Sequence, residues 1–155
     1  MSPDLKRELK QNKPFKSLCQ EAQLNIVRTS NILVNDFERM LKPYGITGTQ
    51  YNVLRILRGA EPAGLCRNEV AERLINRMPD ATRLLDRMED AGLVTRERSE
   101  ADRRLVTTRI TKEGKKLVDS LDDEVEAQHE KGLGHLGKKD LEKLIELLTL
   151  VRSHN

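Results

Sequence analysis

Arginines are concentrated in the middle third of this chain, and their chemistry is the first feature that suggests a function. A guanidinium group can donate two hydrogen bonds to O6 and N7 of guanine, or a bidentate pair to a phosphate. Amide and hydroxyl side chains can contact base edges and phosphates as well. The residues that could do this chemistry in one short segment are Arg67, Asn68, Arg77, Thr82, Arg83 and Arg87. Together they predict contacts with double-stranded DNA.

A second group of charged residues, 99–104, lies between two segments rich in Val, Thr and Leu, 93–98 and 105–110. This pattern predicts a β-hairpin with a charged tip. Arg103 and Arg104 are at that tip, and the negative potential of a narrow minor groove attracts inserted arginines. The hairpin is therefore a second candidate for contact with DNA.

Residues 79–91 are predicted to form the helix that reads the DNA. Pro79 suits a first helical turn and Gly92 suits the position just after the end. The apolar residues are spaced as on one buried helix face, at Ala81, Leu84, Leu85 and Met88. The N-terminal end of such a helix normally enters the major groove. The base-proximal candidates are therefore Arg77, Met78, Asp80, Thr82 and Arg83.

Arg87 lies one turn further along and is expected to meet a phosphate or to pair with an acid. In the alternative interpretation, Arg83 and Arg87 belong to an ordinary solvated face, with Asp86 and Asp90 as local partners.

Two shorter helices precede this one in the sequence. Thr47 and Gln50 have the spacing of a capping box, and the helix that they begin should end at Gly59. A further short helix is expected over about 67–75. Its free N-terminal amides could bind phosphate together with Arg67 and Asn68. Short helices followed by a hairpin predict a winged helix-turn-helix over about 47–110.

Long amphipathic segments flank this unit, at about 14–42 and 112–152. Thr111 is a plausible N-cap for the second, which should break at Gly132 and Gly134 before a final helix over 138–152. With 34% charged and only 3% aromatic residues, the chain has little material for the core of a monomer. We therefore expect a single domain over 1–155, mainly α with a small β-wing, in which the flanking segments are dimerisation helices.

Other classes of protein fit the sequence poorly. No signal peptide or membrane-spanning run is evident, which predicts a soluble, cytoplasmic protein without a membrane partner. The spacing of His129, Glu130 and His135 does not match a zinc site, so no metal is expected. No Gly-rich phosphate loop and no Ser/His/Asp arrangement with local motif support occurs. We therefore expect neither a cofactor nor an enzymatic activity.

Several motifs in one order resemble the MarR family of transcriptional regulators. Asp102-Arg103-Arg104 and the following Leu105-Val106-Thr107-Thr108-Arg109-Ile110-Thr111-Lys112-Glu113-Gly114 resemble the family's wing signature. Segments 46–54, 69–74 and 82–89 resemble the helices of its DNA-reading unit, and Gly92-Leu93-Val94 resembles the exit from the reading helix. The resemblance covers nearly the whole chain from Phe15 to Arg152.

The resemblance implies that Arg104 enters the minor groove and that Asp102 holds the wing by pairing with a nearby arginine. Arg103 would contact phosphate or compete for insertion. It also implies a homodimer joined by the first and last helices, a palindromic operator, and repression commonly relieved by a small ligand or an oxidant. The resemblance further implies a ligand pocket, for which Tyr44, Tyr51 and Arg109 are the candidate lining residues.

This sequence departs from the usual start of the family's reading helix, which is polar and lacks proline. Pro79 removes one amide donor, and Asp80 repels phosphate but could accept from cytosine N4. The sequence preference should therefore differ from that of other family members.

Two alternatives stay open. In the first, the protein is a thiol-based redox regulator, with Cys66 or Cys19 as the reactive group. Cys66 lies beside Arg67 at a helix N-terminus and so has the more favourable electrostatic surroundings. In the second, the winged helix is a protein-interaction module that recognises no operator.

Overall fold

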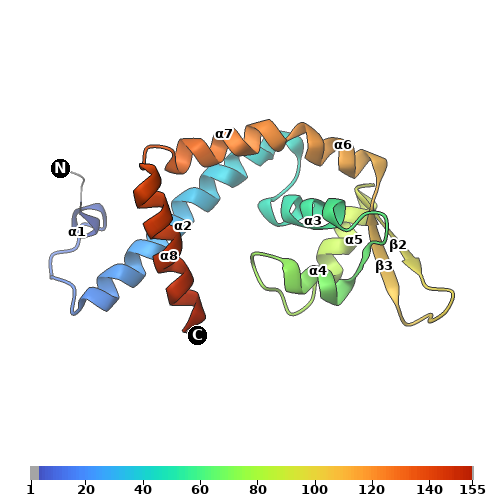
Figure 1. The fold of residues 1–155 in the computed structure, drawn as a ribbon, viewed down its shortest axis with the longest axis horizontal. Coiled ribbons are helices and arrows are strands. Elements are labelled where there is room, and N and C mark those ends of the chain that lie inside the picture. The colour runs from blue at the N-terminus through green and yellow to red at the C-terminus, as the bar shows by residue number, and fades with distance from the viewer. Residues whose placement is uncertain (1–3, 155) are drawn as a thin grey trace. The chain divides into compact units, whose positions relative to one another are not determined.

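A computed structural model describes residues 4–154 of the chain (Figure 1). Backbone contacts divide the chain into two units, the residues up to Met40 and those from Leu41 onward. The first unit contains the short helix α1 and nearly all of the long helix α2, with bounds Leu5–Glu8 and Leu18–Leu41. The second unit contains every other helix and strand.

Helix α2 begins four residues later than the sequence pattern from Pro14 indicates. The Ser17 hydroxyl accepts the backbone N–H of Gln20 at 3.1 Å, which is how an N-cap residue satisfies the first helical turn. Most of the helix is exposed, including its large hydrophobic side chains Leu18, Ile26, Val27, Ile32 and Val34.

The second unit begins with three helices that pack around one core. After a 3₁₀ turn at Lys42–Tyr44, the helices are α3 (Gly48–Gly59), α4 (Arg67–Arg73) and α5 (Thr82–Asp90). The largest fully buried side chains come from all three, among them Leu54, Leu57, Val70, Leu85 and Met88. The predicted capping box of α3 is confirmed, because the Thr47 hydroxyl accepts from Gln50 N–H and the Gln50 amide accepts from Thr47 N–H.

The described residues also form a three-stranded antiparallel sheet. Strands β2 (Val94–Arg98) and β3 (Val106–Ile110) make the predicted hairpin, which extends beyond the helices in Figure 1. The sequence pattern missed the third strand, β1 (Leu65–Cys66), which pairs with β3. Two residues are too few for a periodic signal. The close pairing depends on Gly64, where a Cβ would lie only 2.6 Å from the Thr108 carbonyl oxygen.

The prediction that Pro79 begins the reading helix is wrong. Helix α5 starts at Thr82, and residues 74–81 form the loop that precedes it. Asp80 supplies a physical reason, because its carboxylate accepts the Thr82 N–H at 2.9 Å in a turn that precedes the N-cap residue Ala81. The predicted end is confirmed, since Gly92 follows the helix with φ of +73°.

The long helix expected after Thr111 is two helices, α6 (Lys112–Ser120) and α7 (Asp122–Leu133). Thr111 is the N-cap as predicted, accepting the Gly114 N–H at 3.0 Å. The unpredicted break is at Leu121, whose N–H donates to the carbonyl three residues back, that of Val118. The carbonyl four residues back belongs to Leu117 and instead accepts the Ser120 hydroxyl at 2.7 Å.

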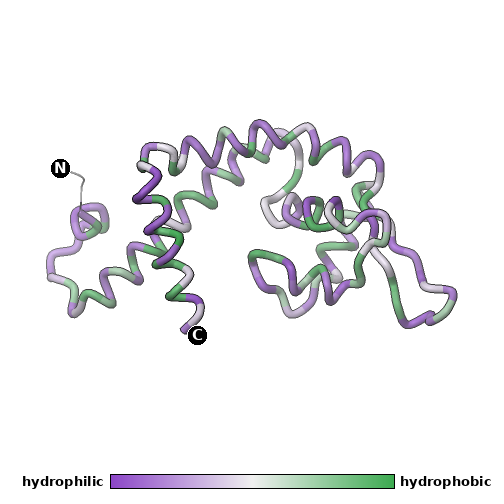
Figure 2. The backbone as a smooth tube through the Cα atoms, in the orientation of Figure 1, coloured by the Kyte–Doolittle hydropathy of each residue, from purple (hydrophilic) through white to green (hydrophobic). Residues whose placement is uncertain are grey.

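The last helix, α8 (Lys138–Ser153), follows α7 after a sharp turn (Figure 1). Hydrophobic residues recur along it in Figure 2, and the exposed large ones are Ile145, Leu147, Leu150 and Val151. No helix in the described part of the chain is long and apolar enough to cross a membrane.

Candidate nucleic-acid interface

The start of α4 presents Arg67 and Asn68 to solvent. Strand β1 ends at Cys66, which is the N-cap residue of α4, so the two exposed residues are the first of the helix. The Cys66 N–H donates to the Glu69 carboxylate at 2.7 Å. This hydrogen bond lowers the pKa of Glu69 and holds its carboxylate at the N-terminus of α4.

Arg67 links α4 to the start of the reading helix α5. Its guanidinium donates to the Thr82 hydroxyl at 3.1 Å, and the Thr82 hydroxyl in turn donates to Asp80 at 2.5 Å. The Arg67 and Asp80 charged groups are 3.8 Å apart. Hydrogen bonds from Thr82 lower the pKa of Asp80, so its carboxylate stays ionised at neutral pH. Three predicted DNA contacts thus bond to one another in the free protein.

The outer face of α5 carries Arg83 and Arg87, both exposed, whereas Leu85 and Met88 on the inner face are buried. Within residues 4–154, neither guanidinium lies within 4.0 Å of a carboxylate. The local pairing with Asp86 that the alternative interpretation proposed does not form. Both arginines therefore keep their donors available for a ligand outside the chain.

Asp86 pairs instead with Arg96 of β2, for which the sequence predicted no role. The Arg96 guanidinium lies 2.6 Å from Asp86 and 2.5 Å from Glu89, and its side chain is only 23% exposed. The hydrogen bonds that Arg96 donates to Glu89 and Asp86 raise the pKa of Arg96. One cation from the sheet therefore neutralises two carboxylates that α5 would otherwise present to a polyanion. The sequence signal that could have indicated this role is the alternation in the strand, which places Arg96 on the same face as Val94.

The hairpin tip presents Asp102, Arg103 and Arg104, all of them exposed. The Asp102 carboxylate accepts the backbone N–H of Arg104 at 3.0 Å, and the Leu105 N–H donates to the Asp102 carbonyl at 2.9 Å. Asp102 therefore organises the turn through the backbone. No arginine guanidinium of the described chain lies within 4.0 Å of it, contrary to the pairing expected from the family resemblance.

A cavity of about 260 Å³ lies where these elements meet. Arg67, Asn68, Thr82 and Arg104 all contribute to its lining, so the starts of α4 and α5 and the hairpin share one surface. Arg77 and Met78 lie on a different hollow of about 560 Å³, which is lined by residues of α4 and of the loop before α5.

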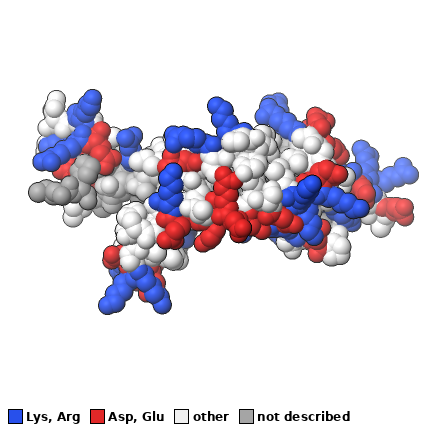
Figure 3. Space-filling model, turned by 90° about the horizontal axis from the view of Figure 1, so that it is seen from above, with Lys and Arg blue, Asp and Glu red and all other residues white. Residues whose placement is uncertain are grey.

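Charge is unevenly distributed over the second unit. Figure 3 shows Asp and Glu gathered along α7, and Lys and Arg extending at the hairpin end. The first turn of α7 alone contains Asp122, Asp123 and Glu124. A polyanion would be attracted to the hairpin end and repelled from α7.

Comparison with solved structures identifies the family. The crystal structure of a MarR transcription factor from Planctomyces limnophilus is 39% identical, with a TM-score of 0.68, over 88% of this chain and 99% of that one. The chain belongs to the MarR family.

Further similarities agree with membership of this family. The MarR family profile matches residues 44–105, which include α3, α4, α5 and β2. The HTH-type transcriptional regulator FarR of Neisseria gonorrhoeae is 29% identical over 87% of this chain and 91% of its own length. The transcriptional repressor CouR, solved on a 23-mer DNA duplex and known from Rhodococcus jostii RHA1, is 26% identical with a TM-score of 0.76, over 92% of this chain and 99% of that one. The protein is thus a MarR-family DNA-binding transcriptional regulator, and such regulators are not enzymes.

The residues expected to line a ligand pocket in this MarR protein have separate surroundings. The Tyr44 hydroxyl donates to Glu124 of α7, which raises the pKa of Tyr44. Tyr51 is buried in α3, and burial raises its pKa. Arg109 donates to the Pro62 carbonyl at 3.1 Å and to Glu97 at 3.0 Å. Neither of the two cavities described above is lined by any of these three residues.

The two cysteines are free thiols in different settings. Cys19 is exposed near the start of α2, whereas Cys66 is half-buried and lines the 260 Å³ cavity beside Arg67. Among residues 4–154 no group of three or more His, Cys, Asp and Glu side chains is placed to hold a metal ion.

Proposed function

We propose that this MarR-family protein is a homodimeric repressor that reads a near-palindromic operator in double-stranded DNA. The observation that carries the proposal is the exposed cationic surface formed by the outer face of α5 and the hairpin tip. Arg83 and Arg87 would approach base edges and phosphates in the major groove, and Arg104 would enter the adjacent minor groove, with Arg103 on the phosphates. The other candidate contacts that belong to this surface are Arg67, Asn68, Arg77, Met78, Asp80, Thr82 and Asp102.

The exposed apolar side chains of α2 and of α8 support the dimer. Four large hydrophobic side chains of α8 are 48–63% exposed, and five on α2 are 42–83% exposed. Surfaces of this kind are usually buried against a partner. A second copy is the occupant that a two-fold symmetric operator requires. Sedimentation velocity at micromolar concentration should therefore give a mass near twice 17.7 kDa.

A small organic effector is expected to release the protein from its operator. CouR has been solved with p-coumaroyl-CoA, and the regulation of DNA binding by 6-hydroxynicotinic acid has been described for BpsR of Bordetella bronchiseptica. Carrying such regulation over to this chain rests on family membership alone. The proposed contacts for an effector are still Tyr44, Tyr51 and Arg109.

The test of operator reading is selection of bound duplexes from a random pool at moderate salt. Enrichment of one near-palindrome would support the repressor, whereas uniform or absent binding would favour a protein-interaction module. Arg83→Ala and Arg104→Ala should each weaken binding to the selected duplex at least about fivefold, because each removes a contact worth about 1–3 kcal/mol. Lys139→Ala, at an exposed position on α8, is the matched control and should change the affinity less than twofold.

The position of Cys66 favours thiol-based regulation as a second candidate. Its thiol lines the same cavity as Arg67 and Arg104, so a modified sulfur would lie among the proposed DNA contacts. An organic hydroperoxide would transfer one oxygen to the thiol, giving a sulfenic acid and the alcohol. Peroxide should then release the operator from wild type and Cys19→Ser but not from Cys66→Ser. Equal release from all three proteins would remove Cys66 from the mechanism.

A further inference from the structure

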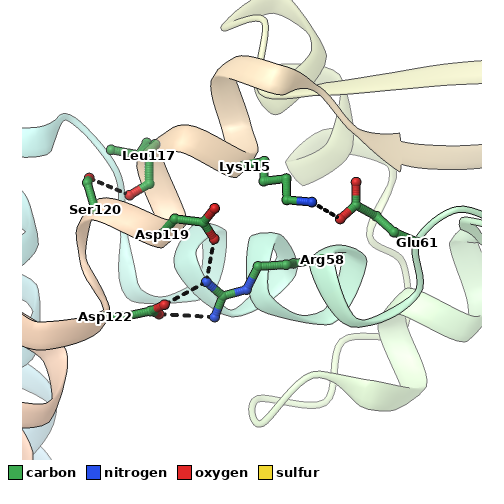
Figure 4. Close-up of polar contacts among 7 residues, drawn as sticks. All are labelled: Arg58, Glu61, Lys115, Leu117, Asp119, Ser120 and Asp122. Atoms are coloured by element: carbon green, nitrogen blue, oxygen red, sulfur yellow. Dashed lines mark hydrogen bonds and ion pairs between the residues drawn. The ribbon is translucent and has the colours of Figure 1, made fainter.

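Arg58 joins three helices of the second unit at one point (Figure 4). It lies in the last turn of α3 and its side chain is 25% exposed. One terminal nitrogen lies 2.7 Å from Asp119 of α6 and 2.9 Å from Asp122 of α7, and the other donates to Asp122 at 3.0 Å. The guanidinium therefore binds Asp122 with both ends and Asp119 with one.

The two carboxylates lie on either side of the break between α6 and α7. Leu121, the residue between the helices, is completely buried, as is Val118 before it. A single helix needs no external support for its direction, but two helices separated by one residue can meet at a range of angles. Because Arg58 holds the last turn of α6 and the first turn of α7 together, it restricts that angle.

Two other polar contacts join neighbouring parts of the same region. The Lys115 ammonium lies 2.8 Å from Glu61 and connects α6 to the loop after α3, without touching α7 (Figure 4). Tyr44 donates to Glu124 and fixes α7 to the 3₁₀ turn from one further side. Of these contacts, only that of Arg58 includes both sides of the break.

We infer that Arg58 is a positioning residue that sets the direction of α7 and α8 relative to the DNA-reading helices, and thereby the half-site spacing that the dimer accepts. The inference rests on the proposed function, because α8 carries the exposed apolar side chains assigned to the dimer. The reading helix α5 and the hairpin lie on the other side of the junction. Any change of angle at Leu121 is therefore passed on to the distance between the two reading units.

The lengths involved make this effect large enough to matter. The 12 residues of α7 span about 18 Å at the usual rise of an α-helix. A rotation of about 10° at its first turn would move its far end by roughly 3 Å, given that length. Successive base pairs along the duplex are about 3.4 Å apart. A change of about 10° in the angle between α6 and α7 therefore corresponds to a change of about one base pair in the half-site spacing.

The test uses the selected operator in a series of duplexes whose half-sites are moved together or apart by one and two base pairs. Arg58→Lys keeps the positive charge but cannot hold both carboxylates with a planar fork. We expect it to reduce the preference for the best spacing over its neighbours at least fivefold. The double variant Asp119→Asn, Asp122→Asn removes the same contacts from the other side and should give the same flattened profile. Lys115→Met, which breaks the neighbouring bridge, should keep the wild-type profile.

A direct measurement of geometry separates positioning from general loss of stability. Nitroxide labels on Thr95→Cys, an exposed position of β2, in a Cys19→Ser, Cys66→Ser background would report the distance between the reading units of a dimer. Arg58→Lys should broaden or shift that distance distribution, whereas Lys115→Met should not. Weaker binding by the same factor at every spacing, with an unchanged distance distribution, would overturn the inference. If wild-type protein selects no palindrome, the proposed function fails instead, and the label distances alone decide the role of Arg58.

Discussion

The Asp80 carboxylate accepts both the backbone N–H and the hydroxyl of Thr82, at 2.9 and 2.5 Å. Asp80 lies just before the N-cap residue Ala81 and satisfies the first amide of the reading helix, and one of its two oxygens is occupied before any DNA arrives. The Thr82 hydroxyl is committed in the same way, because it donates to Asp80 and accepts from Arg67. The sequence alone suggested that Asp80 could accept from cytosine. Both contacts with Thr82 use Oδ1, so Oδ2 is the oxygen that would take that role.

Replacing Asp80 by alanine should lower the thermal stability of the protein, because the first amide of α5 loses its hydrogen-bond acceptor. Asp80→Asn keeps an acceptor oxygen and should recover most of the loss. Differential scanning calorimetry measures both. If Asp80 instead read a cytosine, Asp80→Ala would change the selected operator sequence while leaving the melting temperature unchanged.

Arg96→Met should weaken binding to any duplex, by about tenfold, because Asp86 and Glu89 would face the phosphates without a counter-charge. Its effect on the free energy of unfolding should be small, about 1 kcal/mol or less, since both acids are partly exposed. Fluorescence anisotropy with a non-operator duplex and urea unfolding give the two quantities. Adding Asp86→Asn and Glu89→Gln to Arg96→Met should restore the affinity, and failure to do so would mean that Arg96 contacts the DNA itself.

The hairpin arginines should contribute to the salt dependence of binding. Each phosphate contact adds about 0.9 to the slope of log affinity against log salt concentration. Arg103→Ala should lower the slope by about 1 on operator and non-operator duplexes alike, as expected for a phosphate contact. Arg104→Ala should also reduce the ratio of operator to non-operator affinity. If Arg103→Ala rather than Arg104→Ala reduced this ratio, Arg103 would be the residue in the minor groove and Arg104 the phosphate contact.

The contact between Asp122 and Arg58 should make stability depend on pH in the acidic range. Hydrogen bonding by Arg58 lowers the pKa of Asp122, and nearby Arg55 acts in the same direction. A carboxyl whose pKa is lower in the folded state stabilises the fold above its unfolded pKa, about 3.9, and loses that effect as the pH falls through the folded value. Asp122→Asn should therefore be less stable than wild type at pH 7, with a difference that shrinks below about pH 4. A difference that stays constant in urea unfolding down to pH 2.5 would contradict this contact.

The protein should be more stable with valine in place of Thr108. The side chain is 1% exposed, and within the described residues its hydroxyl oxygen has no hydrogen-bond partner. An unsatisfied buried hydroxyl costs about 1–3 kcal/mol, and an apolar group of the same shape removes that cost. We expect Thr108→Val to raise the free energy of unfolding by about 1 kcal/mol. Thr107→Val, at the neighbouring half-buried position, is the control and should change it much less.

Features that depend on residues a few positions apart could be predicted from the sequence. The Thr47 capping box, the buried stripe of α5 at Leu85 and Met88, and the glycine at position 92 belong to this class. Each is decided by helical geometry within one or two turns, or by one residue's tolerance of positive φ. The candidate interface followed from the same local patterns, because outward residues are those that the buried stripe leaves over.

Features that depend on residues far apart in the chain were decided by the tertiary structure. The pairing of β1 with β3, the neutralisation of α5 by Arg96, and the contact of Arg58 with Asp122 join segments that no periodicity relates. In a chain with 34% charged residues, each arginine could pair with many different acids. Which acid it meets depends on which helices and strands pack side by side. The sequence by itself determined the order of most helices, the hairpin and the exposed cations, whereas only packing decided the break at Leu121 and which charges remain free to meet DNA.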